Sequence, residues 1–347
     1  MDVSCTNLSY PWRKPPEFGD FIEVASGVFW FRLPLPMKLN HVNVYVLDDG
    51  DGWTVVDTGF CAKLSLEIWQ SMLAGPLADK PVRRLLVTHH HPDHVGLAGW
   101  FQRHHTVELL MSRTAWLFAR MLTLDKQEKM VEENVAFFSS AGMSPELLEA
   151  RKREIPFNFA DIVAPLPLGY TRIKHGDIIQ MGGRNWSVHV GNGHAPEHLT
   201  LWSRDDGLVI SGDQILPSIS PNIGVYATEP LADPLADWIE ACTRLAKLAT
   251  YNQLVLCGHK LPFTGLPVRM QQLLNHHQQV LDRLLIFLEY PHSAAECFEP
   301  LFQRKIHDNE YGLAIVEAIA HVNHLFLSGQ VRRFCRTDGA WLYQRKL

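Results

Sequence analysis

The sequence predicts an α+β protein with two domains. Short runs rich in β-branched and aromatic residues, bounded by Gly, Pro and Asp, recur over the first 264 residues and are typical of strands. Between the later strand-like runs lie segments whose apolar residues recur with the period of a helix, and such segments dominate from residue 265 onward. At 347 residues the chain is longer than one average domain. We therefore expect a first domain over residues 1–264 and a second over residues 265–347.

The amino-terminal part is expected to form a meander of strands. Asp48–Gly52 is a strong turn signal, and Leu33–Pro36 interrupts the strand pattern and is expected to be a loop. A helix is expected over Lys63–Leu73. The strand-like runs are Phe21–Val24, Val28–Arg32, Val42–Leu47 and Thr54–Val56.

A loop rich in metal-binding side chains follows the next strand. Leu85–Thr88 is apolar and partly β-branched, as in a buried strand. Four His and one Asp then fall between His89 and His94. This run lies inside the chain between apolar segments, so an expression tag is excluded. Because imidazole and carboxylate groups suit zinc and its first-row neighbours, the pattern predicts a metal site.

The spacing within this loop divides its side chains between two ions. Side chains two residues apart in an extended segment point the same way, so His89 and His91 can share one ion. Asp93 and His94 fall on the turn into a short helix and can face a second ion. The alternative is a solvent-facing polar loop, but the pattern His-x-His-x-Asp-His is far more restrictive than a His-rich run.

The rest of the first domain mixes helices and strands. A strand over Thr106–Met111 is expected to lead into one long helix, Ser112–Ala141, and then a second, Pro145–Arg153. The block 112–170 is longer than a simple connection needs, and we interpret it either as a cap over the substrate or as a structural helical pair. The later expected elements are strands at Ile178–Met181, Trp186–Val190, Leu199–Trp202, Leu208–Ser211 and Leu254–Cys257, and a helix at Asp233–Ala249.

The segment from His89 to His94 resembles the signature of the metallo-β-lactamase-fold hydrolases. Further pieces of that family's pattern follow in order, so the resemblance covers about residues 21–264. It implies a four-layer αββα sandwich with the metal ligands at one edge of the two sheets. It also implies that Asp57 supports the metal loop. A cap on the following helix, made by Asp57 or Thr58, is an equally good interpretation.

The resemblance also implies the rest of the ligand set. His194 follows a small residue in the second motif, Asp213 ends an apolar strand where the family places a bridging Asp, and His259 ends another where the family has its last ligand. Glu197 stands where relatives often have Gly, and His198 is not expected to be a ligand. The implied assignment is His89, His91 and His194 on the first ion, Asp93, His94 and His259 on the second, and Asp213 bridging both.

Two divalent ions held in this way imply a hydrolase. Their combined charge would lower the pKa of a shared water toward neutrality, and the bridging hydroxide would attack a carbonyl or phosphoryl centre. Asp93 is also the candidate catalytic residue, because it is the carboxylate nearest the loop and can orient the water or relay its proton. Zinc is the expected metal, with iron or manganese as alternatives.

A full ligand set with a carboxylate in the metal loop resembles the glyoxalase II type, which favours an ester or thioester of a small acyl molecule as substrate. The apolar segments Leu33–Leu39 and Pro217–Tyr226 suit an acyl chain. One alternative is a phosphodiesterase or ribonuclease of the same fold, and another is a DNA-binding regulator with a sensing metal site. Beyond Arg83, Arg84 and Lys260 the motifs have few basic neighbours, which weighs against a polyanionic substrate.

The second domain resembles the small winged-helix appendage of some family members. The expected helix at 310–327 contains no Lys or Arg, so a packing or dimerisation role is expected in place of DNA binding. His276 and His277 are expected to lie on the surface. The expected elements are helices at 265–289, 294–302 and 310–327 and strands at 331–337 and 340–345, which flank the hairpin signal Asp338-Gly339.

The composition is that of an ordinary globular protein, and a cytoplasmic location is expected. The net charge of -5 gives no strong attraction to nucleic acid. The six cysteines, from Cys5 to Cys335, form no C-x-x-C pair and are expected to be free thiols. Residues 1–19 lack the apolar core of a secretory signal, and no apolar run approaches the length of a membrane span. The expected partner is a small-molecule substrate, and a homo-oligomer is left open.

Overall fold

The computed structural model describes residues 7–308 and 310–346, and Cys5 lies outside them. The chain divides into two compact units, each assembled from separate stretches of sequence. The domain boundary expected after residue 264 stays a prediction, and so does the interpretation of the block 112–170 as either a cap or a structural helical pair. Unit 1 holds the described residues up to Lys126 with Asn158–Pro221 and Leu245–Met270, and unit 2 holds Gln127–Phe157, Asn222–Arg244 and the described residues from Gln271 onward.

The first sheet of unit 1 has seven strands in sequence order. Strands β1 to β4 form the expected antiparallel meander, and β4 to β7 run parallel. The loop expected from Leu33 begins later, because Leu33 and Pro34 still pair with Val42 and His41. The strands are β1 (Ile22–Ala25), β2 (Val28–Pro34), β3 (His41–Asp48), β4 (Trp53–Val56), β5 (Val82–Leu86), β6 (Glu108–Met111) and β7 (Thr171–Arg172).

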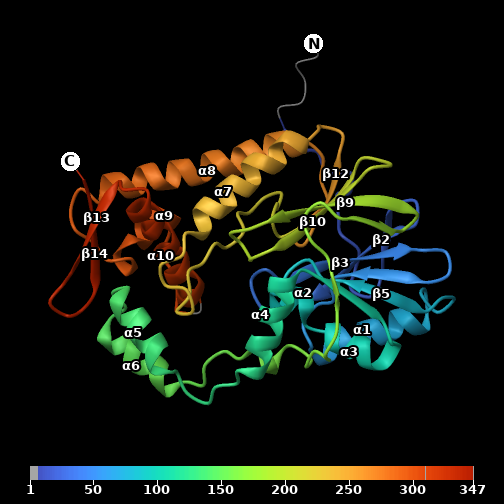
Figure 1. The fold of residues 1–347 in the computed structure, drawn as a ribbon, viewed down its shortest axis with the longest axis horizontal. Coiled ribbons are helices and arrows are strands. Elements are labelled where there is room, and N and C mark those ends of the chain that lie inside the picture. The colour runs from blue at the N-terminus through green and yellow to red at the C-terminus, as the bar shows by residue number, and fades with distance from the viewer. Residues whose placement is uncertain (1–6, 309, 347) are drawn as a thin grey trace, which may run out of the picture. The chain divides into compact units, whose positions relative to one another are not determined.

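The second sheet of unit 1 has five strands in the order β12-β11-β10-β9-β8. Its strands pair antiparallel except for β11 and β12, which are parallel. Figure 1 shows strands β9 and β10 of this sheet in yellow-green and β12 in orange, beside the blue strands of the first sheet. The strands are β8 (Ile178–Met181), β9 (Arg184–Gly191), β10 (His198–Ser203), β11 (Leu208–Gly212) and β12 (Leu254–Cys257).

The two sheets face each other across an apolar core. Trp30 and Tyr45 from the first sheet and Trp186 and Leu201 from the second belong to one buried cluster. Burial of each such side chain contributes roughly 1.5–3 kcal/mol. The Tyr45 hydroxyl also donates a hydrogen bond of 2.8 Å to the carbonyl of Cys257 on β12, which ties the inner faces of the sheets together.

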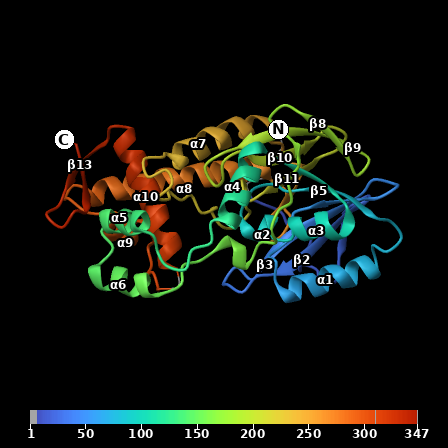
Figure 2. The same ribbon diagram turned by 60° about the horizontal axis from the view of Figure 1, so that its bottom comes forward.

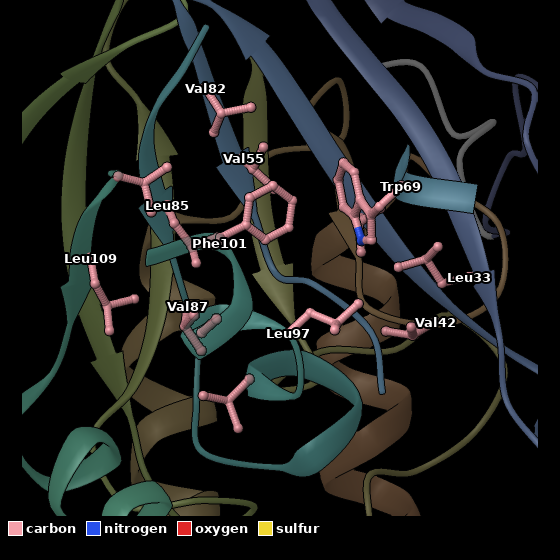
Figure 3. Packing of buried hydrophobic residues seen from close by; sticks show 14 of the residues in the cluster. Leu33, Val42, Val55, Trp69, Val82, Leu85, Val87, Leu97, Phe101 and Leu109 are labelled. Atoms are coloured by element: carbon pink, nitrogen blue, oxygen red, sulfur yellow. The ribbon is translucent and has the colours of Figure 1, made fainter. Parts of the chain in front are cut away.

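Helices α1 (Lys63–Ala74) and α3 (Ala98–His105) cover the outer face of the first sheet. Trp69 of α1 and Phe101 of α3 meet edge to face, with ring centroids 4.9 Å apart. Figure 3 shows the Phe101 ring beside Val55 of β4 and Leu85 of β5 and the Trp69 ring near Leu33 of β2, and Figure 2 shows α1 and α3 next to each other. Helices α1 and α3 and strand β5 thus contribute to one buried cluster, and the candidate metal loop leaves the end of that strand.

The single helix expected over 112–141 is wrong. The structure has two helices, α4 (Arg113–Leu124) and α5 (Glu132–Ser140), and a non-helical segment between them. The backbone leaves the helical region at Asp125, whose φ and ψ are -84° and 70°. The sequence from Asp125 to Lys129 is entirely polar, so it offers no apolar face that would repay a continuous helix.

Apart from α5, the helices of unit 2 follow the expected pattern. Asp233 caps α7 by accepting a hydrogen bond of 3.0 Å from the backbone N–H of Ala236. The remaining elements are the short α2 (Pro92–Val95) and η1 (Phe159–Asp161), α6 (Pro145–Arg153), α7 (Pro234–Leu245), η2 (Ala246–Leu248), α8 (Leu266–Phe287), η3 (Ala295–Cys297), α9 (Phe298–Phe302), α10 (Tyr311–Leu327) and the hairpin of β13 (Val331–Cys335) and β14 (Trp341–Arg345).

The described cysteines are free thiols, namely Cys61, Cys242, Cys257, Cys297 and Cys335. Within residues 7–308 and 310–346, no helix combines the length and the apolar character that crossing a membrane requires.

The expectation of a surface position is wrong for His277, although it holds for His276. His277 is 1% exposed, and its ring lies 4.8 Å from Trp238 and 5.6 Å from His321, which is also 1% exposed. Burial lowers the pKa of His277 to about 2 and the pKa of His321 to about 4. Both rings are therefore neutral in the folded protein at neutral pH.

We expect these rings to destabilise the fold in mild acid. A histidine with an unfolded pKa near 6.5 and a folded pKa of about 4 takes up its proton first in the unfolded chain, so the free energy of unfolding falls as the pH drops below 6.5. The loss from His321 alone should reach about 2 kcal/mol near pH 5. His321→Met should shrink this pH dependence in denaturant unfolding, whereas His276→Gln, at the exposed neighbouring position, should leave it unchanged. A pH dependence that is identical in all three proteins would contradict the assignment.

Candidate metal centre

The side chains predicted as ligands leave the same ends of several strands. The first metal loop runs from the end of β5 into α2 and carries His89, His91, Asp93 and His94. His194 lies between β9 and β10. Asp213 directly follows β11, and His259 lies in the turn after β12. Strands β11 and β12 are parallel neighbours, so their ends bring Asp213 and His259 together.

The seven side chains form three overlapping groups, in each of which the potential ligand atoms lie within 4.8 Å of one another. In the first group, His89 Nε2 lies 3.0 Å from His91 Nδ1 and 3.3 Å from His194 Nε2. Three ring nitrogens thus converge on one point. The groups are His89, His91 and His194; His89, His94 and Asp213; and Asp93, His94 and His259.

Asp213 links the groups. Its Oδ2 lies 3.7 Å from His194 Nε2 and 3.1 Å from His259 Nε2, and its Oδ1 lies 3.4 Å from His94 Nε2. His94 Nε2 and Asp213 Oδ1 are buried, and neither makes a hydrogen bond to another described residue. Buried polar atoms without such a partner are costly in a native protein. Together with the converging imidazoles and carboxylates, they form a donor set that fits divalent metal ions.

Burial and charge oppose each other in this cluster. Burial alone would lower the pKa of His94, but the carboxylates of Asp213, Asp93 and Asp57 outweigh it and raise that pKa well above its ordinary value. In the same way, burial is outweighed at His259, whose pKa rises to about 10. Burial would raise the pKa of Asp213, but His259 and His94 hold it well below its usual range. The centre therefore keeps its carboxylates ionised, which favours cations.

Hydrogen bonds hold the imidazoles with one nitrogen free. His94 Nδ1 lies 2.7 Å from Asp57 Oδ2, and His259 Nδ1 lies 2.7 Å from the carbonyl oxygen of His41. His89 Nδ1 lies 2.9 Å from the Thr88 hydroxyl. In each ring the Nδ1–H can donate to oxygen, which leaves Nε2 with the lone pair that a metal ligand needs.

Asp57 supports the metal loop and does not cap the helix. Its carboxylate accepts hydrogen bonds from the backbone N–H and the hydroxyl of Thr88 in addition to contacting His94. The N-terminus of α1 has Ala62 at its cap position, with no side-chain cap. The Thr58 hydroxyl instead donates to the carbonyl of His94. Of the two interpretations left open by the sequence, the supporting role therefore matches the structure.

Glu197 keeps the left-handed turn that a Gly would favour. Its φ is 47°, a conformation that is strained for a residue with a Cβ. Its N–H donates to Asn192 Oδ1 at 2.8 Å, and its Oε2 accepts a hydrogen bond from the N–H of Thr114 in the first turn of α4. These bonds offset the strain and tie the His194 loop to α4.

His198 lies beneath the ligands. Its ring stacks on His89 with centroids 4.5 Å apart, and its Nε2 accepts a hydrogen bond of 3.1 Å from the backbone N–H of Asp213. Gly212 makes this possible, because a Cβ there would lie 2.7 Å from the His198 ring. The His90 ring lies 4.8 Å from the His91 ring and 5.2 Å from the Phe118 ring, and His90 belongs to none of the three ligand groups.

Asn43 is an important residue that our sequence analysis missed. It is 1% exposed in the middle of β3, and its side-chain amide donates to the carbonyls of Cys257 and Lys260 at 2.8 Å each. Its Oδ1 accepts from Trp30, and its backbone N–H donates to the carbonyl of Gly258. Asn43 thereby clamps the turn that carries His259. The available signal was one Asn inside the otherwise apolar run Val-Asn-Val-Tyr-Val.

We expect Asn43→Asp to disrupt this clamp with almost no change in shape. The carboxylate cannot donate to the two carbonyls and places a buried charge against them, so the free energy of unfolding should fall by about 3 kcal/mol. Metal content should fall with it, because His259 loses its support. The measurements are denaturant unfolding and metal analysis of purified protein. Asn252→Asp, in an exposed turn, is the matched control and should change neither; equal behaviour of the two variants would show that the clamp is unimportant.

Comparisons with known proteins agree with this geometry. A family model described as the metallo-beta-lactamase superfamily matches residues 37–259, and a model of the metallo-beta-lactamase-like C-terminal domain matches residues 281–346. The chain is 25% identical over 317 residues to the probable metallo-hydrolase YqjP of Bacillus subtilis (strain 168), covering 87% of this chain and 92% of that protein.

Two solved structures extend the similarity to the whole chain. A beta-lactamase domain protein from Burkholderia ambifaria is 35% identical with a TM-score of 0.89, and the match covers 100% of this chain and 99% of that one. A metallo-beta-lactamase family protein from Thermus thermophilus is 26% identical with a TM-score of 0.78, covering 93% and 100%. The predicted fold class is confirmed, and the chain belongs to the metallo-hydrolases of the metallo-beta-lactamase superfamily and carries the C-terminal domain found with it.

Proposed function

We infer that the protein is a dinuclear metal-dependent hydrolase that acts on an ester or thioester. The observation that carries this proposal is the contact of one carboxylate, Asp213, with imidazoles of each ligand group. A shared carboxylate is a common way to hold two ions close together. We assign His89, His91 and His194 to one ion and Asp93, His94 and His259 to the other, with Asp213 bridging.

Two divalent ions at these ligands would supply an activated water as nucleophile and would polarise the substrate carbonyl. Asp93 is proposed to orient that water. Its Oδ2 lies 3.2 Å from His259 Nε2 and 3.6 Å from His94 Nε2, at the edge of the second group. Its side chain is 17% exposed, whereas that of Asp213 is 8% exposed, so Asp93 is the carboxylate more open to water and substrate.

The neighbouring charges support an acyl substrate over a polyanion. Arg84 pairs with Asp49 at 2.7 Å, and Arg83 contacts Asp51 at 3.4 Å. Both arginines lie on β5, before the metal loop that leaves the other end of that strand. They are therefore neutralised and directed away from the ligands, where they could not hold a phosphodiester.

The other candidate functions have less support. The phosphodiesterase or ribonuclease alternative needs cations that face the centre, whereas Arg83 and Arg84 contact Asp51 and Asp49. The regulator alternative needs a basic helix, but α10 (Tyr311–Leu327) contains no Lys or Arg. The glyoxalase II-like and winged-helix-like features, the choice of zinc over iron or manganese, and the cytoplasmic location remain proposals of the same kind.

The metal assignment can be tested with substitutions in the first metal loop and at Asp213. His89→Ala and His91→Ala should each reduce metal content, because both residues belong to ligand groups. Asp213→Ala should reduce it most, from about two ions per chain to one or fewer. His90→Ala is the matched control, since the same residue type in the same loop belongs to none of the ligand groups, although its ring lies beside His91 as well as Phe118. Elemental analysis of the purified variants decides, and a loss of metal in His90→Ala equal to that in His89→Ala would refute the assignment.

The substrate class needs a direct comparison on one preparation. We expect the metal-loaded protein to hydrolyse at least one of a panel of acyl-CoA, acyl-glutathione, simple ester and lactone substrates, and to lose that activity with a chelator and regain it with zinc or manganese. Asp93→Asn should lower turnover by more than its metal content explains. Efficient cleavage of bis-p-nitrophenyl phosphate, with the whole acyl panel left intact, would replace this proposal by the phosphodiesterase alternative.

A further inference from the structure

The loop that carries His194 is held at its base by the backbone. This loop, residues 192–197, connects β9 to β10. The N–H of Leu199 in β10 donates a hydrogen bond of 2.8 Å to the carbonyl of Thr88, which attaches the start of β10 to the segment that leads into the first metal loop. The base of the His194 loop therefore keeps an attachment to the first sheet that does not depend on the side chains of the loop.

Glu197 fixes the loop itself. Its N–H donates a hydrogen bond of 2.8 Å to Asn192 Oδ1, which closes the loop into a turn that contains His194. Its Oε2 accepts a hydrogen bond of 2.6 Å from the N–H of Thr114 in the first turn of α4, and its Oε1 lies 3.8 Å from the guanidinium of Arg172 on β7. A carboxylate also suits the positive end of the α4 dipole. One side chain thus joins a loop of the second sheet to the first sheet and to the helix that follows β6.

The proposed first ion needs ligands from both sheets. His89 and His91 follow β5 of the first sheet, whereas His194 follows β9 of the second. The Nε2 atoms of His194 and His89 lie 3.3 Å apart, so a small displacement of the His194 loop changes the arrangement of the nitrogen donors directly. Removing residues that orient metal ligands typically weakens metal binding by about 10- to 100-fold.

The proposed second ion has a support of its own. Asn43 of β3 donates to the carbonyls of Cys257 and Lys260 and thereby holds the turn that carries His259. Asn43 and Glu197 each connect a ligand of the second sheet to the first sheet, but the two ligands belong to different ions in the proposed assignment. The affinity of each ion can therefore change separately.

We propose that Glu197 is a positioning residue for the first ion, and that its bond to α4 holds His194 where its imidazole can share a metal ion with those of His89 and His91. The inference rests on the proposed function for the division of the ligands between two ions. Loss of the bond weakens the first ion and leaves the second in place. A glycine at this position eases the strained backbone but leaves the loop without its attachment to α4.

Zinc affinity, measured by competition with a chromophoric chelator, tests this role. Glu197→Ala should weaken the binding of one ion by about tenfold and leave the other unchanged. Glu197→Gln keeps an oxygen that can accept from the N–H of Thr114 and should bind zinc within about threefold of the wild type, because the partly exposed pair with Arg172 is weak. Glu108→Ala, which removes a similar side-chain bond to Thr171 at the start of β6, is the matched control and should bind zinc like the wild type. Unchanged affinity in Glu197→Ala, or equal weakening of both ions, overturns the inference.

Double substitutions identify the ion that Glu197 supports. In a His91→Ala background, where the first ion has already lost a ligand, adding Glu197→Ala should remove little more zinc. In an Asp93→Ala background it should reduce zinc from about one ion per chain toward none. Elemental analysis after dialysis against buffered zinc decides, and equal further losses in the two backgrounds overturn the inference. If the wild type holds a single ion, the dinuclear proposal fails, whereas an affinity for that ion that falls in Glu197→Ala and returns in Glu197→Gln still supports the positioning role.

Glu197→Gly separates positioning from stability. The metal-free Gly variant should unfold at a temperature roughly 2–4 °C higher than the metal-free Ala variant, because glycine relieves the strain that a φ of 47° imposes. Both variants lose the bond to Thr114, so both should bind the first ion equally weakly. Zinc affinity that recovers in the Gly variant together with its stability would show that Glu197 acts only on the fold, and would overturn the inference.

Discussion

The buried carboxylate of Asp213 is the group on which the arrangement of unit 1 depends. A buried charge without compensation is too costly to keep, so everything around it must supply opposite charge or hydrogen bonds. The imidazoles of His94, His194 and His259 surround it, and His198 holds its backbone. The same crowding excludes a side chain at Gly258, where a Cβ would collide with Asp213 Oδ1. Side chains that follow strands of both sheets therefore surround this carboxylate and compensate its charge.

Much of the fold and the candidate loop from His89 to His94 could be predicted from the sequence, because the relevant signals are local, whereas His194, Asp213 and His259 were proposed only from the family resemblance. The strands around the metal loop are short apolar runs, and His-x-His-x-Asp-His places its side chains by spacing alone. The break after Asp125 was missed because an imperfect apolar period extends across it, although the polar stretch from Asp125 to Lys129 could have indicated it. The burial of His277 was missed because it depends on Trp238 and His321, which lie far away in the sequence.

The supporting residues were harder to predict for the same reason. Asn43 bonds to the carbonyl of Cys257, 214 residues away, and no local pattern announces such a contact. Three of the left-handed residues other than glycine, Asp57, Glu197 and Lys260, also lie in or beside the metal loops. Each keeps its strained backbone because hydrogen bonds to other segments of the chain, and for Glu197 also to Asn192 in its own loop, hold it in place. Strain of this kind arises only in the folded site and cannot be predicted from the sequence of any single loop.

The long separation between Asn43 and the turn it clamps also affects how the protein is made. His259 follows His94 by 165 positions in the chain, and a ribosome adding about 5–20 residues per second needs on the order of ten seconds or more to produce that stretch. During that interval the first metal loop exists without His259, for most of it also without Asp213, and the inner face of the first sheet has no complete partner. An ion captured by the nascent loop would have only part of its ligands. Complete metal loading must therefore follow the docking of the second sheet, one of the last steps in the maturation of unit 1.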